Sequence, residues 1–331
     1  MTVLVLLPGA SGPHITYHHN SQPMNSKKSR PYWLHALSPL HVGAGRGAGF
    51  IDLPLVREKV TTWPYVPGSS VKGIVAAHHT TSEQSDLFKT AFGCGGDSDA
   101  LAGALVFSDA RLVALPVPSF FGTFAWITSP FALRRLTRDL VMSNVKSPGT
   151  IPTPVSMGDA LTPQDTTVLS ERGDNRIFLE DLDLARKNDE QTTLWAAQIA
   201  QWLFGEDKSW SDQFINRFAV VADEVFNFLT HTATEVRARI RVGEAGTAAD
   251  QALWYEESLP AETLLVGFVW CEPPFKGRQH EPNDLLHKFA SGDLYLQVGG
   301  KATIGHGRVR CRFTANDSTP HEHQHPIHPH S

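Results

Sequence analysis

The order strand, helix, strand occurs twice in the hydrophobicity pattern of this 331-residue chain, once near each end. The predicted elements are a strand at 32–37, a helix at 69–78 and a strand at 104–115, and then a strand at 264–271, a helix at 283–290 and strands at 294–298 and 309–313. Two such units can share one sheet. We therefore expect an α+β fold with an RRM-like, ferredoxin-like sheet.

The long stretch between these two units predicts insertions into that sheet. It holds predicted strands at 123–128 and 176–184, predicted helices at 131–141, 194–204 and 222–229, and a predicted hairpin at about 235–255. A chain of this length is either two ordinary domains or one domain with large insertions. Because the two units belong to one sheet, we expect a single domain at 31–315.

Both ends of the chain have compositions that do not build a core. Residues 1–30 are rich in Gly, Ser, His and Asn, and we expect a disordered leader in which Met24 is a second candidate start. Residues 316–331 contain five histidines among prolines, which predicts a disordered, His-rich tail.

Composition excludes several classes of protein. Apolar residues make up 41% of the chain and charged residues 19%, which is typical of a folded protein and not of a disordered one. No apolar run approaches the roughly 20 residues of a membrane span, so we expect no membrane partner. The three cysteines lack metal-ligand spacing, which favours a reducing, cytoplasmic location. A net charge of −5 argues against binding nucleic acid through overall charge alone.

Arginines are nevertheless concentrated in stripes. Arg237, Arg239 and Arg241 alternate along one predicted strand, and Arg308, Arg310 and Arg312 along another. Alternating residues share one face of a strand, so each group forms a basic stripe. A stripe of this kind is either a solvated sheet face or a phosphate-binding surface. A third group, Arg134, Arg135 and Arg138, lies on one side of a predicted helix.

A first glycine-rich loop follows the first strand. Residues 41–49 begin with His41 and contain Arg46, and a single carboxylate, Asp52, follows them. The glycines invite a dinucleotide interpretation, but their spacing departs from G-x-G-x-x-G and Pro54 follows where a helix should begin. We therefore expect a mobile loop, and from the pattern alone Asp52 is more simply an ordinary loop aspartate.

Two further segments have phosphate-binding character. Ser69, Ser70 and Lys72 fall in the first turn of a predicted helix, with Ser69 as its expected cap. A capped helix with a solvated lysine is the alternative there. The second glycine-rich loop, 299–307, contains Gly299, Gly300, Lys301 and Gly305 and leads into Arg308, so its amides and basic side chains could line a phosphate chain.

Taken in order, these motifs resemble the RAMP superfamily of CRISPR proteins, and more narrowly the backbone subunits of type III-B effector complexes. The resemblance extends over about 31–315 and rests on the segments 34–45, 51–58, 63–73, 107–111, 121–130, 254–260 and 299–312. His306 departs from it, because an arginine or an aromatic residue is expected at that position.

The resemblance implies an RRM-like palm, a thumb formed by the 235–255 hairpin, and copies assembled head to tail along a CRISPR guide RNA with other subunits of the complex. It implies cleavage of a complementary target RNA at Asp52 with a divalent metal, Mg²⁺ or Mn²⁺, bound by Asp52. His41 and Glu257 are the candidates to assist Asp52. The RNA-binding residues implied are Arg46, Ser69, Ser70, Lys72, Arg237, Arg239, Gly299, Gly300, Lys301, Gly305 and Arg308.

Two alternatives stay open at this point. The chain could be a structural RNA-binding backbone subunit in which Asp52 is catalytically inert, or a guide-processing ribonuclease, since RAMP proteins include such enzymes. No Ser-His-Asp or Cys-His set can be assigned among the histidines, so a hydrolase with a side-chain nucleophile has little support.

Overall fold

The computed structural model describes residues 29–47, 49–80, 85–94, 101–242, 248–272 and 280–314. The predicted tail and all but the end of the predicted leader lie outside these residues. The first strand, β1 (Ser29–Ala36), begins two residues before the expected start of the domain.

One half of a large sheet has the strand order that the repeated strand-helix-strand pattern predicts. Its four central strands are β16 (Arg308–Phe313), β1, β14 (Leu264–Cys271) and β6 (Ala110–Pro118), paired in that order and all antiparallel. Helix α1 (Gly68–His79) follows β1, and helix α7 (Pro282–Phe289) follows β14. This is the ferredoxin-like order, so the expected α+β sheet is confirmed.

The predicted strand at 104–115 is two strands in the structure. A short β5 (Leu105–Phe107) pairs with β14, and β6 begins after a break at Ser108 and Asp109. The Phe268 N–H donates to Ser108 Oγ at 2.8 Å, and Asp109 Oδ1 accepts from the Gly68 N–H at 2.8 Å. The break therefore places two polar side chains where they bind neighbouring backbone.

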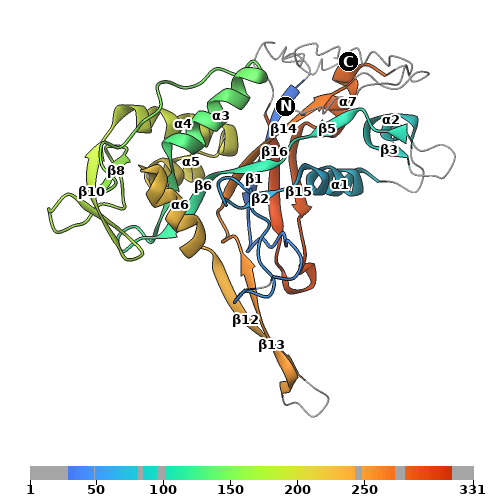
Figure 1. Cartoon of the computed structure of the whole chain (residues 1–331). Coiled ribbons are helices and arrows are strands. Elements are labelled where there is room, and N and C mark those ends of the chain that lie inside the picture. The colour runs from blue at the N-terminus through green and yellow to red at the C-terminus, as the bar shows by residue number, and fades with distance from the viewer. Residues whose placement is uncertain are drawn as a thin grey trace, which may run out of the picture.

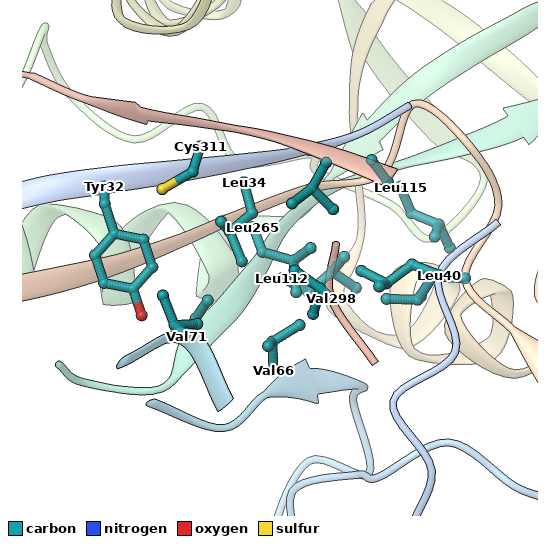
Figure 2. Close-up of a cluster of buried hydrophobic side chains, with 14 of the residues drawn as sticks. Tyr32, Leu34, Leu40, Val66, Val71, Leu112, Leu115, Leu265, Val298 and Cys311 are labelled. Carbon is teal, nitrogen blue, oxygen red and sulfur yellow. The ribbon is translucent and has the colours of Figure 1, made fainter. Parts of the chain in front are cut away.

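Alternating side chains of β1 enter two cores on opposite faces of the sheet. Tyr32 and Leu34 pack with Val71 of α1 and with neighbouring strands, as Figure 2 shows. Trp33 faces the other way and stacks on Trp202 with ring centroids 5.6 Å apart. The second core is covered by α4 (Glu190–Phe204) and α5 (Lys208–Ile215). Burial on both faces fixes the register of β1, because a slip of one residue would exchange the two sets.

The insertion extends the sheet as well as adding helices. Beyond β6 the order continues through β7 (Phe124–Thr128), β11 (Phe218–Val221), β8 (Asp159–Thr162), β10 (Leu182–Asn188) and β9 (Arg176–Leu179). The prediction of one strand at 176–184 is wrong, since the chain reverses at Glu180, whose φ is +48°. The predicted helices are α3 (Pro130–Met142), α4 and α6 (Asp223–Thr232).

Several short elements complete the fold. They are β2 (Tyr65–Val66), α2 (Asp86–Phe92), β3 (Gly93–Cys94), β4 (Leu101–Ala102), β15 (Gly292–Gln297) and a 3₁₀ turn, η2 (Ala302–Ile304). In the described part of the chain, no helix is long and apolar enough to cross a membrane.

The predicted hairpin is formed by β12 (Glu235–Val242) and β13 (Ala248–Ser258), and it projects from the body of the molecule (Figure 1). Its base lies beside the first glycine-rich loop, because Leu53 bridges to Glu256 and Leu40 to Leu259. This contact positions the site described next.

Candidate nucleic-acid interface

The two glycine-rich loops meet at His41. The Gly300 N–H donates to the His41 carbonyl at 3.2 Å, and a Cβ on Gly299 would lie 2.1 Å from the same oxygen. Only a glycine allows this approach, and Gly299 also has a φ of +73°. The two glycine-rich loops are therefore in direct backbone contact.

The imidazole of His41 is buried and has a defined orientation. Its Nδ1–H donates to the Glu257 carbonyl at 2.6 Å, because a carbonyl can only accept. Its Nε2 faces Gly43, where an added Cβ would lie 2.8 Å from that nitrogen. Among the described residues Nε2 has no hydrogen-bond partner.

Asp52 lies on a segment that is fixed to the hairpin. The Leu53 N–H donates to the Tyr255 carbonyl at 3.1 Å, and the Glu257 N–H donates to the Leu53 carbonyl at 3.1 Å. The Tyr255 N–H in turn donates to Asp52 Oδ2 at 2.8 Å. These hydrogen bonds hold the carboxylate in place against β13, at the end of the loop that we expected to be mobile. Asp52 itself is exposed.

Asp52 borders a cleft of about 490 Å³ between the first loop and the hairpin. The cleft is lined by Arg46, Gly47, Asp52, Leu53, Arg241, Leu253, Trp254 and Lys301. Three cationic side chains thus line the same cleft as one exposed carboxylate, and one of them, Lys301, is paired with Glu256. Such a group of cations attracts a phosphate backbone, and the carboxylate would lie beside the bound phosphate.

Lys301 and Arg239 are held by a carboxylate that the sequence analysis did not single out. Glu256 Oε1 lies 2.6 Å from Lys301 Nζ and accepts from Trp254 Nε1–H at 2.7 Å, and Oε2 accepts from Arg239 Nε–H at 3.2 Å. Burial raises the pKa of Glu256, but the hydrogen bonds from Lys301, Trp254 and Arg239 outweigh it and lower that pKa to about 2. Glu256 is therefore ionised and joins the second loop to both hairpin strands.

Glu257 faces the other side of the same strand and does not line the cleft. Its Oε1 accepts from Arg57 and from Thr234 Oγ1, the latter at 3.0 Å, and its Oε2 accepts from the Leu55 N–H at 2.9 Å. The side chain is buried and its oxygens are occupied. The geometry gives Glu257 a positioning role, in which it holds the segment after Asp52 against the base of the hairpin, and does not favour the direct catalytic role that we expected.

The start of α1 differs from the sequence prediction. Pro67 is the N-cap, and the Gly68 N–H is bound by Asp109, so the expectation that Ser69 caps the helix is wrong. Ser69 is exposed, while Lys72 is half-buried, and burial lowers the pKa of Lys72. Lys72 has no ion-pair or hydrogen-bond partner among the described residues. Ser69, Ser70 and Lys72 are separate from the residues that line the cleft.

The two strand stripes are partly neutralised by acidic neighbours. On β12, Arg237 pairs with Glu235 and Arg239 with Glu256, whereas Arg241 lines the cleft. On β16, Arg310 and Arg312 share Asp293, with a distance of 2.6 Å from Arg310 Nη2 to Asp293 Oδ2. The exposed Arg308 side chain has no ion pair within the described part of the chain.

The third arginine group is largely structural. Arg135 forms two hydrogen bonds to Glu58 and lies 5.9 Å from the ring centroid of Trp63. Arg138 and Arg111 pair with Asp139. These contacts fix α3 to Glu58 and to β6, whereas the exposed Arg134 has no ion pair within the described part of the chain.

His306 closes the second glycine-rich loop. Its N–H donates to the Lys301 carbonyl at 3.2 Å, and its side chain is buried. Burial, followed by the positive charges of Arg237 and Arg239, lowers the pKa of His306. A neutral imidazole therefore packs where the resemblance predicted an arginine or an aromatic residue.

Comparison with known proteins decides the family. A profile of the RAMP superfamily matches residues 33–310, which is most of the chain. The chain belongs to the RAMP superfamily. The RAMP match spans both glycine-rich loops, Asp52 and the hairpin.

Individual RAMP relatives narrow the similarity. The chain is 32% identical over 286 residues to the CRISPR system Cmr endoribonuclease Cmr4 of Pyrococcus furiosus, covering 84% of this chain and 92% of that protein. It superposes on the crystal structure of oligomeric Cmr4 from Pyrococcus furiosus with a TM-score of 0.67 and 25% identity, covering 86% of this chain and 97% of that one. A chain in the cryo-EM structure of the type III-B Cmr-beta complex bound to cognate target RNA has the same fold, with a TM-score of 0.66, 18% identity and coverage of 86% and 96%.

Proposed function

We propose that this chain is a backbone subunit of a type III-B RNA-guided effector complex, which binds the guide RNA and cleaves complementary target RNA at Asp52. The observation that carries the catalytic part is the exposed Asp52 carboxylate, held by the Tyr255 N–H beside three cationic side chains. The similarity to a protein named Cmr endoribonuclease, and to an oligomeric Cmr4, supports the RNA substrate and the head-to-tail copies. The proposal includes other subunits of the complex as partners and a cytoplasmic location.

The cleft suits an internal attack on the RNA backbone. In that reaction the 2′-oxygen bonds to the adjacent phosphorus and the bond to the 5′-oxygen breaks, which leaves a 2′,3′-cyclic phosphate and a 5′-hydroxyl. Asp52 takes the 2′-hydroxyl proton, and the departing 5′-oxygen takes a proton from solvent. Arg46, Arg241 and Lys301 neutralise charge that develops on the phosphate oxygens. The protein supplies positioning, charge and one base.

A divalent ion, Mg²⁺ or Mn²⁺, fits this site if Asp52 and the RNA phosphate are both its ligands. Among the described residues no group of three or more His, Cys, Asp or Glu side chains is arranged to hold a metal. Within the described part of the chain, Oδ2 of Asp52 accepts a hydrogen bond and Oδ1 accepts none. Mg²⁺ is commonly held by one or two carboxylates together with substrate phosphates and water. An ion bound in this way would add positive charge at the phosphate.

A catalytically inert backbone subunit is the second candidate, and one contact favours it. The hydrogen bond from the Tyr255 N–H gives Asp52 a structural role in docking the loop on β13. An aspartate retained for that contact alone would need no chemistry. The two functions differ in the effect of removing the charge from Asp52.

The test is Asp52→Asn in complexes reconstituted with guide RNA and assayed with a labelled target RNA in magnesium or manganese. Asparagine keeps the acceptor oxygen for the Tyr255 N–H but loses the base, so assembly and target capture should persist while cleavage falls by at least about 10²-fold. Wild-type cleavage should recur at regular intervals, one site per copy. Asp174→Asn, an exposed aspartate away from the cleft, is the matched control. Undiminished cleavage by Asp52→Asn would remove Asp52 from the mechanism, and no cleavage by wild type would support the inert subunit.

A further inference from the structure

An exposed aromatic pair lies directly beside Asp52. The side chain of Phe50 is 75% exposed and rests on Tyr255, with ring centroids 4.6 Å apart and planes inclined by 30°. Tyr255 is also the residue whose N–H holds Asp52. One aromatic face of Phe50 is therefore presented to solvent two residues from the proposed base, and neither ring has a role in the mechanism above.

Tyr255 and the Glu256 ion-pair cluster lie on opposite faces of the hairpin, and the cationic cleft is lined from both faces, by Leu253 and Trp254. Along β13, Tyr255 and Leu253 share one face, and Trp254 and Glu256 share the other. On the first face the opposing β12 residues, Ala238 and Ile240, are exposed and apolar. The second face carries the Glu256 cluster with Arg239 and Lys301.

Asp52 lies at the boundary between these two faces. It borders the cationic cleft, while its Oδ2 is bound by the backbone of Tyr255, whose ring belongs to the aromatic side. A bound strand with charge on one side and flat apolar rings on the other would match this boundary. A single RNA strand has that chemistry, with phosphate and base on opposite sides of each sugar.

We propose that Phe50, supported by Tyr255, is a platform on which one unpaired base of the target RNA stacks while the neighbouring phosphate lies in the cationic cleft. This inference rests on the proposed RNA-binding function and adds a substrate contact to it. Every base has a flat π face, so the contact is independent of sequence and suits a protein whose specificity comes from guide pairing. Arg46, four residues before Phe50 on the same loop, supplies the charge complementarity that favours RNA over an apolar protein surface.

Stacking on this platform has a consequence for the reaction. A strand whose base lies on the aromatic side and whose phosphate lies on the cationic side must turn across the edge that holds Asp52. That turn unstacks the nucleotide and lets its 2′-oxygen align with the phosphorus and the departing oxygen, which a regular helix prevents. Phe50 is thus a substrate-binding residue that positions the strand, and Asp52 acts on what it positions.

The contact can be tested without cleavage. Complexes are reconstituted with guide RNA and the Asp52→Asn chain, and the target RNA carries 5-iodouridine at successive positions, because this base crosslinks on irradiation to an aromatic ring stacked on it. We expect crosslinks to the peptide that contains Phe50, at positions spaced like the cleavage sites, with loss in Phe50→Ala and retention in Phe50→Trp. Phe120→Ala is the matched control, since Phe120 is also 75% exposed but lies in the insertion beside Phe121.

The cleavage rate gives the second readout. In the background that keeps Asp52, Phe50→Ala should lower the single-turnover cleavage rate roughly 10-fold at saturating target, which corresponds to one lost base stack. Phe50→Trp should retain most of the cleavage rate. Crosslinks that are absent at every position, or that persist in Phe50→Ala, would overturn the platform. Loss of multi-copy assembly in Phe50→Ala would also overturn it and assign the ring to a second copy of the chain. Crosslinking without any cleavage would leave the platform standing and reject only the catalytic proposal.

Discussion

The ammonium nitrogen of Lys301 lies 2.6 Å from Oε1 of Glu256, which fixes a cation of the second glycine-rich loop to the base of the projecting hairpin. Lys301 has a φ of +71°, an uncommon conformation for a residue with a side chain, and the ion pair helps to hold it there. Glu256 also binds Arg239 on the neighbouring strand. The cationic side of the cleft is therefore built before RNA arrives.

This pairing predicts a pH-dependent stability. The pKa of Glu256 is lowered to about 2 from an ordinary value near 4.5, so its contribution is fully present above about pH 4.5 and is lost as the pH falls through about 2. Glu256→Gln should reduce the free energy of unfolding by on the order of 1–3 kcal/mol near neutral pH. The deficit should shrink as the pH falls below 4.5. Denaturant titrations of both proteins near neutral pH and at about pH 3 measure it.

A double-mutant cycle supplies the control for that prediction. If Lys301 and Glu256 stabilise each other, the effect of Lys301→Ala should be smaller in the Glu256→Gln protein than in the wild type. Additive effects of the two substitutions would show that the pair contributes no coupling. A deficit that stays constant across the acidic range would contradict the lowered pKa.

Substitutions at Glu257 and at Asp52 should differ, the first lowering stability and the second lowering cleavage. The Glu257→Ala substitution removes the buried carboxylate that pairs with Arg57 Nη2 and accepts from Thr234 Oγ1 and the Leu55 N–H, so we expect a loss of about 3–5 kcal/mol in unfolding free energy. Asp52→Asn should change stability by less than about 0.5 kcal/mol, because the carboxylate is exposed. Thermal melts of both variants beside their cleavage rates test the distinction. A fully stable Glu257→Ala protein that fails to cleave would restore Glu257 to the catalytic residues.

The fold was predictable where local periodicity decides it. The strands and helices of the ferredoxin-like unit follow apolar alternation, and their order alone led to the sheet. The hairpin at 176–184 was missed because its turn uses Glu180 at a φ of +48°, where a glycine or asparagine would have given a signal. The four-residue β11 was missed because a short apolar run does not distinguish strand from helix.

The candidate site was only partly predictable, for a different reason. The glycine pattern marks the two loops, and the family resemblance singles out Asp52 and His41, but the roles of Glu256 and Glu257 depend on partners remote in the chain. Alternation along β13 places these neighbours on opposite faces, where Glu256 meets Lys301 and Glu257 meets Arg57. Adjacent glutamates in a strand motif indicate two faces, and only the tertiary structure assigns a partner to each.

The close approach of the His41 ring to Gly43 predicts the effect of replacing that glycine. A Cβ at Gly43 would lie 2.8 Å from His41 Nε2, so Gly43→Ala should displace the buried ring. If Nε2 serves the RNA, target cleavage should fall about 10-fold or more while the fold persists. Gly49→Ala is the control, since no atom lies within 4 Å of its added Cβ. Equal cleavage by the two variants, with circular dichroism showing both folded, would exclude His41 from the reaction.

Lys72 provides a test of RNA binding away from the cleft. Its side chain is half-buried, burial lowers its pKa, and it has no acidic partner among the described residues. A phosphate would therefore supply the charge-assisted hydrogen bond that a lysine paired within the protein already has. Lys72→Ala should weaken RNA binding nearly equally for unrelated sequences, and the slope of log affinity against log salt should become shallower by about one. Lys208→Ala removes an exposed lysine at the start of α5 and should leave that slope unchanged. Filter binding at several salt concentrations, with two unrelated guides, measures the slopes. A loss confined to one guide would mean that Lys72 reads bases, and an unchanged slope would place Lys72 outside the RNA path.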